Sequence, residues 1–117
     1  MKRIYCAGKY SGDNVLSVLQ NIGRGEKIAA SLFANGYAPF SPWADKDFCF
    51  KLPDHDFTVR QFYDYSIAWL EVSEAVFLVP GWEESAGTLK ELEIAAGLGL
   101  PVFTNFKDLD NFFKAEG

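Results

Sequence analysis

The sequence predicts one α/β domain over residues 1–117, in which helices cover both faces of a parallel β-sheet. Three observations lead to this prediction. Short apolar runs alternate along the chain with segments of helical periodicity. Polar turns that contain glycine follow two of the apolar runs directly. A chain of 117 residues without an internal repeat has the size of a single domain.

The segment from 74 to 102 shows the pattern most clearly. Residues 75–79 form an unbroken apolar run, ended by Pro80 and Gly81, as is typical of a strand buried on both faces. Ser85 is a suitable N-cap for a following helix, which Gly99 and Pro101 end. The apolar stripe of that helix consists of Leu89, Leu92, Ala95, Ala96 and Leu98.

The rest of the chain continues the alternation. Further strands are expected over residues 3–7, 37–40 and 101–104, and prolines at 39 and 42 place the second of them at an edge. Helices are expected over 15–19, 21–34 and 58–70, and around Leu109, Phe112 and Phe113. Gly23 and Gly25 weaken the start of the 21–34 helix. These elements predict a flavodoxin- or Rossmann-like sheet of four to five strands in the order 2-1-3-4.

Composition and charge exclude several classes of function. A 49% apolar and 16% aromatic chain is not disordered. A net charge of −5 without a basic run argues against a nucleic acid polymer or an acidic membrane surface as partner. There is neither a signal peptide nor an apolar segment of the roughly 20 residues that span a bilayer. The expected location is therefore the cytoplasm.

The cysteines indicate neither a disulfide nor a metal site. Cys6 falls in a predicted strand and Cys49 in a predicted loop, with no CxxC motif and a single histidine in the chain. We expect two free thiols, no bound metal and no cofactor.

The turn before the 85–98 helix is a predicted anion site. It lies at the carboxyl edge of the sheet, where the N–H groups of a helix start point outward. Gly87 permits close approach of the backbone to a phosphate, and Ser85 and Thr88 supply hydroxyls. Lys9 and Ser11 follow the first strand at the same edge and are further candidates for a phosphate. An ordinary solvated turn explains those two equally well.

Glu91 lies beside the apolar stripe of the same helix, about one turn beyond this site. Its position fits two interpretations equally. It is either an ordinary carboxylate favoured by the helix dipole or a functional group.

The segment from 41 to 56 has no periodicity, so we expect a long ordered loop. Trp43, Phe48 and Phe50 could stack on a planar base over a cleft, or cover the sheet edge or a second subunit. His55 is expected at the surface.

Several motifs in this order resemble the nucleoside 2-deoxyribosyltransferase superfamily, and most closely its short DUF4406-like branch. They cover nearly the whole chain. They are Tyr5-x-Ala7-Gly8, Asn21-Ile22, the run from Gly36 through Phe40 to Pro42, and the run from Gly81 through Ser85-Ala86-Gly87-Thr88 to Glu91. Pro80-Gly81 with Gly87-Thr88-x-x-Glu91 is also similar to the PGGxGTxxE motif of the lysine-decarboxylase-like phosphoribohydrolases, although inserted residues interrupt it.

The resemblance implies cleavage of the N-glycosidic bond of a (2-deoxy)nucleoside or its 5′-monophosphate. The nucleophile of the family is a glutamate, which corresponds to Glu91. A serine six positions earlier, here Ser85, implies a 5′-monophosphate, because the transferases carry an aspartate there for a free 5′-hydroxyl. Tyr5 and Gly8 match positions that flank the sugar, and Phe40 and Trp43 complete the expected substrate contacts.

One departure concerns leaving-group protonation. The family usually has an aspartate where this sequence has Ser66. Asp64 is near in sequence but projects about 200° away on a helix, and Asp56 is another acid that could substitute. Ser66, Asp64 and Asp56 are therefore the acid or base candidates, and an absent acid predicts slow or lost catalysis.

Two functions remain open. The first is hydrolysis or base exchange of a nucleotide, and the second is a non-catalytic module that binds a nucleotide or an ADP-ribose-like signal. Family members commonly complete each site with a neighbouring subunit, so the resemblance also implies a homodimer or higher homo-oligomer.

Overall fold

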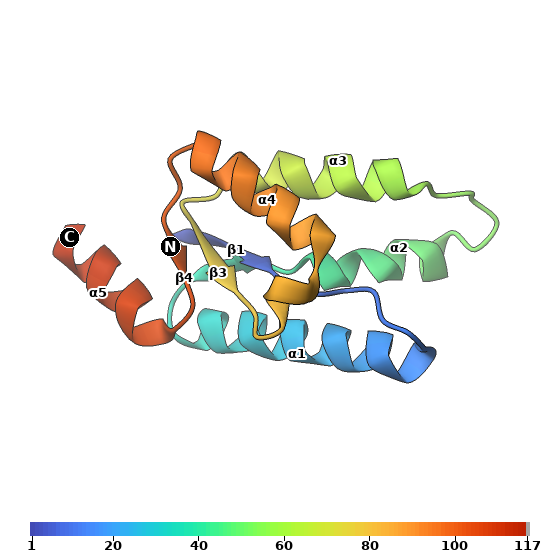
Figure 1. The fold of residues 1–117 in the computed structure, drawn as a ribbon, viewed down its shortest axis with the longest axis horizontal. Coiled ribbons are helices and arrows are strands. Elements are labelled where there is room, and N and C mark those ends of the chain that lie inside the picture. Colours follow the sequence, from blue (N-terminus) through green and yellow to red (C-terminus); the bar gives the residue numbers. More distant parts are fainter. Residues whose placement is uncertain (117) are drawn as a thin grey trace.

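The computed structural model describes residues 1–116, and its centre is an all-parallel sheet of order β2-β1-β3-β4 (Figure 1). The strands are β1 (Arg3–Ala7), β2 (Ala38–Phe40), β3 (Ala75–Leu78) and β4 (Val102–Phe103). The helices of the described chain are α1 (Val15–Ala34), α2 (Lys46–Lys51), α3 (Val59–Leu70), α4 (Ala86–Gly97) and α5 (Phe106–Glu116). Two short 3₁₀ helices, η1 (Pro42–Asp45) and η2 (Trp82–Glu84), precede α2 and α4. The predicted class and strand order are confirmed, with four strands in residues 1–116.

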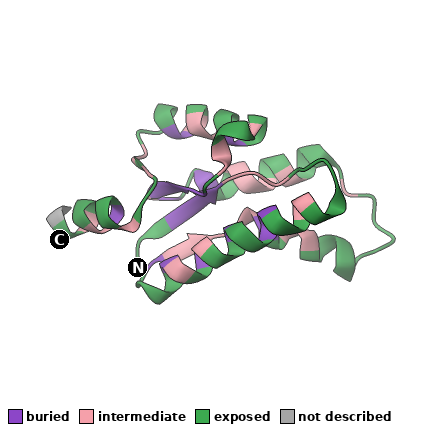
Figure 2. Ribbon diagram, turned by 60° about the horizontal axis from the view of Figure 1, so that its bottom comes forward, coloured by how far each residue is buried: buried purple, intermediate pink, exposed green. Residues whose placement is uncertain are grey.

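Alternating side chains of the strands divide the core into two layers. Ile4 and Cys6 of β1 face the side of the sheet that α1 and α5 cover. Tyr5 and Ala7 face the opposite side, beneath α3 and α4. Burial is concentrated on the strands and on the inward sides of the helices (Figure 2). Tyr5 consequently lies in the same layer as the helix that carries Glu91.

Both borders of the sheet are short. β2 has three residues, pairs with β1 through the register Ile4 to Pro39, and is an edge strand as predicted. β4 has two residues and pairs with β3 alone. The two central strands, β1 and β3, are therefore the longest of the sheet, and all their residues except Arg3 are buried.

Helix α1 corrects the predicted division into two helices over 15–19 and 21–34. It runs without interruption from Val15 to Ala34, and the Asn14 side chain caps it by accepting from the Ser17 N–H at 2.8 Å. Gly25 is retained for packing, because a Cβ there would overlap the indole ring of Trp43. The propensity loss of two glycines is small beside the contacts of a 20-residue helix with the sheet.

The segment from 41 to 56 is the second correction, because much of it is helical. It contains η1 and the six-residue helix α2, which carries Cys49. The Trp43 side chain is only 1% exposed and anchors this segment in the core. Tertiary anchoring, which leaves no periodic signal, explains why these short helices could not be predicted. Helix α3 begins as expected, with a capping box between Thr58 and Gln61.

The packing of Gly25 gives a stability prediction with a control on the same helix. Gly25→Ala should lower the free energy of unfolding by about 1–3 kcal/mol, because its methyl group overlaps Trp43. Gly23→Ala should raise it by about 0.5–1 kcal/mol, because nothing lies within 4 Å and alanine favours the helix. Urea unfolding measures both. Equal effects of the two substitutions would contradict the close packing of Trp43 against Gly25.

Candidate active site

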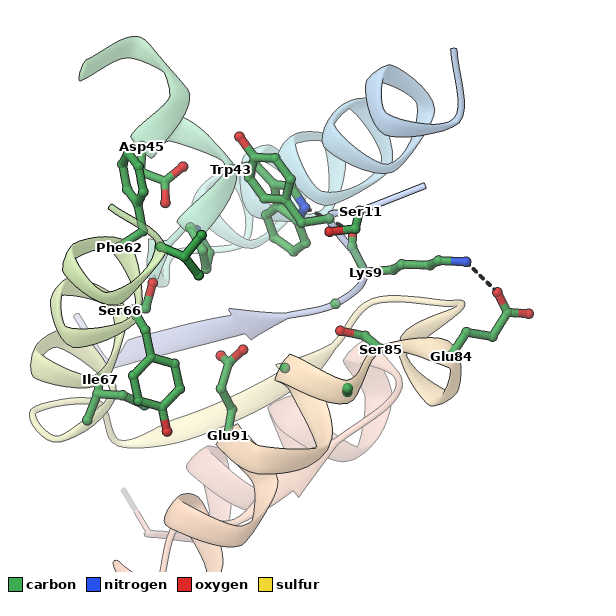
Figure 3. A pocket seen from close by; sticks show the side chains of 17 residues that line it. Lys9, Ser11, Trp43, Asp45, Phe62, Ser66, Ile67, Glu84, Ser85 and Glu91 are labelled. Atoms are coloured by element: carbon green, nitrogen blue, oxygen red, sulfur yellow. Dashed lines mark hydrogen bonds and ion pairs between the residues drawn. The ribbon is translucent and has the colours of Figure 1, made fainter. Parts of the chain in front are cut away.

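A cavity of about 390 Å³ opens at the carboxyl edge of the sheet (Figure 3). Its walls come from the β1–α1 loop, η1, α3 and the start of α4. Lys9, Ser11 and Ser85 form its polar end, and Glu91 projects from α4 between that end and Ser66, Ile67 and Phe62 of α3 (Figure 3). The cavity therefore has a polar end, an acidic middle and a mostly apolar end.

The start of α4 supplies the polar end. Gly81 adopts a left-handed φ of 95°, which turns the chain from β3 toward the helix. Ser85 is the N-cap, and its Oγ accepts from the Thr88 N–H at 3.1 Å, as the sequence predicted. The hydroxyl proton of Ser85 is not used by this bond. Ser85 can therefore cap the helix and donate to an anion in the cavity at the same time.

The β1–α1 loop is held in place by side chains from two other elements. Asn21 of α1 donates through Nδ2 to the carbonyls of Tyr10, at 3.3 Å, and Ser11, at 3.1 Å. Trp43 Nε1 donates to the carbonyl of Lys9 at 3.1 Å. These bonds fix the backbone from which the Lys9 and Ser11 side chains extend.

Lys9 makes an exposed ion pair at the polar end. Its Nζ lies 2.7 Å from Glu84 Oε2, and this hydrogen bond lowers the pKa of Glu84. The pair faces solvent and is easily exchanged, so Lys9 can transfer its interaction to an entering anion.

Glu91 is the unusual ionisable group of the cavity. Its Oε2 is buried and has no hydrogen-bond partner among the described residues. Burial raises the pKa of Glu91 from 4.5 to about 7, and the nearby Tyr5 hydroxyl opposes part of this rise. Burial, followed by the charge of Glu91, also raises the pKa of Tyr5 far above its ordinary value. A desolvated carboxylate with one oxygen free of hydrogen bonds is the arrangement expected of a nucleophile or of a group that stabilises a cation.

The structure brings most of the predicted site residues together. Those that line the cavity are Gly8, Lys9, Ser11, Trp43, Ser66, Ser85, Gly87 and Glu91. Tyr5 lies behind Glu91 with its hydroxyl buried, and Ser66 is close enough to that hydroxyl to affect its pKa. Gly8 allows a close contact at the cavity wall, since a Cβ there would lie 2.8 Å from the Val79 Cβ.

Several other predicted residues lie elsewhere. Phe40 packs against Tyr5, Tyr65 and Trp69 and is not part of the cavity lining. Thr88 is fully buried, and its hydroxyl is not available to a ligand in the cavity.

The acid candidates Asp56 and Asp64 are both exposed and outside the cavity lining. Asp64 pairs with Arg60 at 3.0 Å. His55 is exposed and stacks near Phe57, with a centroid distance of 4.5 Å.

Trp43 differs from the expectation of an aromatic side chain displayed over a cleft. Its ring is buried between Gly8 and Gly25, so it forms part of the wall but does not present an open face. The exposed phenylalanines of this segment are Phe50, at 74%, and Phe48, at 42%.

Sequence reasoning missed several residues at the cavity. Asn21 holds the β1–α1 loop, and Asp45, Phe62 and Tyr63 line the cavity. Asp45 lies two positions after Trp43 in a segment without periodicity, so only its position near an anchoring aromatic residue could have drawn attention to it.

The sequence of the chain matches the model of a known protein family. The model of a family described as "Domain of unknown function (DUF4406)" matches residues 2–104, which is most of the chain. The chain belongs to the DUF4406 family.

A solved structure shows the same fold in a protein of stated activity. This DUF4406 protein is similar to a 2-deoxyribosyltransferase from the psychrotolerant bacterium Bacillus psychrosaccharolyticus, which is described as a biocatalyst for nucleoside synthesis. The TM-score is 0.58 and the identity 21%, over 86% of this chain and 69% of the other. No curated protein matches the sequence. At this identity the similarity establishes a shared fold.

Within residues 1–116, no helix has the length and apolarity that crossing a bilayer requires. The described side chains also include no group of three or more His, Cys, Asp or Glu residues placed to hold a metal ion.

The buried carboxylate predicts a pH-dependent stability difference. The pKa of Glu91 is about 7 in the folded protein and near 4.5 when unfolded. Burying this side chain therefore costs more free energy when it is ionised than when it is neutral. Stability from this group is therefore lost as the pH rises from 4.5 through 7. Relative to wild type, Glu91→Gln should gain on the order of 2 kcal/mol in free energy of unfolding between pH 4.5 and pH 8.5. Urea unfolding of both proteins at both pH values measures this gain. If the difference in free energy of unfolding between variant and wild type were the same at both pH values, Glu91 would be an ordinary surface carboxylate.

Proposed function

We propose that the protein cleaves the N-glycosidic bond of a (2-deoxy)nucleoside 5′-monophosphate, with Glu91 as nucleophile. The observation that carries this proposal is the buried carboxylate of Glu91, whose Oε2 has no partner in the described chain and which faces a cavity of nucleotide-sized volume. A buried carboxylate oxygen without a hydrogen bond is destabilising, which favours a functional role for Glu91 over a structural one.

The chemistry follows from the charge that develops on the sugar. As the bond between C1′ and the base nitrogen lengthens, the sugar becomes oxocarbenium-like. The Glu91 carboxylate stabilises this positive charge and then bonds to C1′, giving a glycosyl ester on the enzyme. Attack by water on C1′ completes hydrolysis, and attack by a second base completes a base exchange. Both routes return Glu91 as a carboxylate.

The polar end of the cavity supports a phosphate on the substrate. Ser85 offers a hydroxyl at the start of α4, next to the backbone of Ala86 and Gly87, where the helix dipole favours an anion. Lys9 lies in the same part of the cavity lining. With the 5′-phosphate at this end, the sugar lies beside Glu91 and the base occupies the apolar end near Phe62 and Ile67.

Removal of the nucleophile should abolish base release. Glu91→Gln should lower the rate by about 10³-fold or more, on the scale of nucleophile deletions in other enzymes. Glu93→Gln is the control, because Glu93 lies on the same helix but is exposed and outside the cavity. Chromatography of free base from a panel of ribo- and deoxyribonucleoside monophosphates provides the measurement. The proposal would be refuted if Glu91→Gln released base at the wild-type rate. It would also be refuted if the wild-type protein released no base from any nucleotide of the panel.

The charge at position 85 should set the preference between a nucleotide and a nucleoside. Aspartate and asparagine both cap helices well, so Ser85→Asp and Ser85→Asn should keep α4 intact. Only the aspartate repels a phosphate, and we expect kcat/KM for the monophosphate to fall about 10-fold or more relative to the asparagine variant. The kcat/KM for the unphosphorylated nucleoside should change little. Parallel losses for both substrates would place the phosphate elsewhere.

A second candidate function is non-catalytic binding of a nucleotide or an ADP-ribose-like signal. It is favoured by Ser66, which lines the cavity at the position where the resemblance expects an aspartate. Calorimetry that detects nucleotide binding, in protein that releases no base, would favour this function over catalysis.

We further propose that the protein acts as a homo-oligomer. Phe50 is 74% and Val59 87% exposed, and both line an apolar hollow that shares residues with the cavity. A neighbouring copy that covered these side chains would also restrict solvent access to the apolar end.

A further inference from the structure

We propose that Asp45 is the general acid that protonates the leaving base, and that it replaces the carboxyl group absent at Ser66. This inference rests on the proposed function, because it assigns a second catalytic residue to the same cavity. Asp45 ends η1 and lies directly before α2, outside the motifs that carry the family resemblance.

Position is the first argument. Among the aspartates considered as acids, Asp56 and Asp64 are outside the cavity lining, whereas Asp45 is within it. Figure 3 shows the Asp45 carboxyl turned toward the cavity beside Phe62, on the far side of Glu91 from Lys9 and Ser85. A nucleotide whose phosphate is near Ser85 and whose sugar is at Glu91 therefore extends its base toward Asp45.

The surroundings of the base end are the second argument. Asp45 also lines the adjoining apolar hollow, together with Val59, Phe62 and Phe50. Flat apolar walls suit a purine or pyrimidine ring, and a single carboxyl among them is placed to contact a ring nitrogen or carbonyl oxygen.

The direction in which the pKa of Asp45 is shifted agrees with this role. Burial raises the pKa of Asp45, while the Tyr10 hydroxyl and the Lys46 ammonium lower it in part. The titratable groups that face this part of the cavity are Tyr10 and Tyr63, with Lys46 and Cys49 in the adjoining hollow. Lys46 is itself engaged by Glu26, at 3.1 Å, which limits its hold on Asp45. A base that enters this end excludes further water and favours the neutral acid.

The proton balance of both steps is complete. In the first step the neutral Asp45 carboxyl gives its proton to the base, the electrons of the C1′–N bond pass to the base, and a Glu91 oxygen bonds to C1′. In the second step a water oxygen attacks C1′, the Asp45 carboxylate takes the proton of that water, and Glu91 leaves as a carboxylate. One water is consumed and Asp45 returns to its neutral form.

The test compares two substrates that differ in their need for a proton. The panel described above identifies the preferred base. Its monophosphate is then compared with the N7-methylated analogue if the base is a purine, since that base leaves without protonation. For a pyrimidine the analogue is the 5-fluoro derivative, which leaves more readily as an anion. Asp45→Asn is isosteric, and Asp47→Asn, at an exposed position on α2 outside the cavity, is the control.

Asp45→Asn should lower kcat on the ordinary nucleotide by about 10²–10⁴-fold and on the activated analogue by much less. Asp47→Asn should resemble wild type on both. We expect kcat/KM of wild type on the ordinary nucleotide to fall at alkaline pH, and this fall should disappear in Asp45→Asn.

The other outcomes are decisive as well. Equal losses on both substrates in Asp45→Asn, or no loss on either, would overturn the assignment of Asp45 and leave Glu91 chemistry standing. If kcat/KM of wild type on the ordinary nucleotide did not fall at alkaline pH, the assignment of Asp45 would be overturned too. This measurement uses wild-type protein alone, so it does not depend on whether a variant folds. Failure of wild type to release base from either substrate would overturn the proposed function itself.

Discussion

The cavity depends on the placement of the Trp43 indole between two glycines. The ring lies against Gly25 of α1 and Gly8 at the end of β1, and its Nε1 donates to the carbonyl of Lys9. One side chain thus joins a helix, the end of a strand and the β1–α1 loop to η1. A displaced ring would move the backbone of Lys9 and Asp45 together, because both depend on the same anchor. Such a close fit explains why two helix- and strand-weakening glycines are tolerated here.

A second constraint acts against stability. The Glu91 carboxylate is taken out of water without a hydrogen bond to its Oε2, and the Tyr5 hydroxyl behind it is buried without a partner among residues 1–116. The Ser85 cap and the Asn21 amide nearby make their hydrogen bonds, whereas the hydroxyls of Ser41 and Thr88 are also buried without one. Among these unsatisfied groups of the described chain, the Glu91 carboxylate is the one that lines the cavity, where a ligand could complete it. The rigid central strands and the two caps hold this unfavourable arrangement in place.

The fold was predictable because its signals are local. The apolar run of β3 carries its strand signal within four residues, and the Ser85 cap and the capping box at Thr58 make their hydrogen bonds within three positions. The errors arose where tertiary contacts decide the outcome. Gly25 was interpreted as a weak point of a helix because its contact with Trp43 is not visible in the sequence. Asp45 was missed for the same reason, since only folding brings η1 against α3.

The same division between local signals and tertiary contacts applies to the site residues. Ser85, Gly87 and Glu91 share one turn and one helix, so their common orientation follows from helical geometry. Phe40 and Thr88 lie within the same matched motifs, yet the structure turns them into the protein interior. A motif therefore predicted which segments form the cavity more reliably than which side chains enter it.

The short borders of the sheet limit how copies of this protein can associate. β2 contains Pro39, which has no N–H to offer, and β4 is only two residues long. Neither border presents the long row of free backbone groups that templates strand addition by another molecule. Any self-association would therefore use helical and loop surfaces, and the short borders disfavour edge-to-edge polymerisation through the sheet even when the protein is crowded.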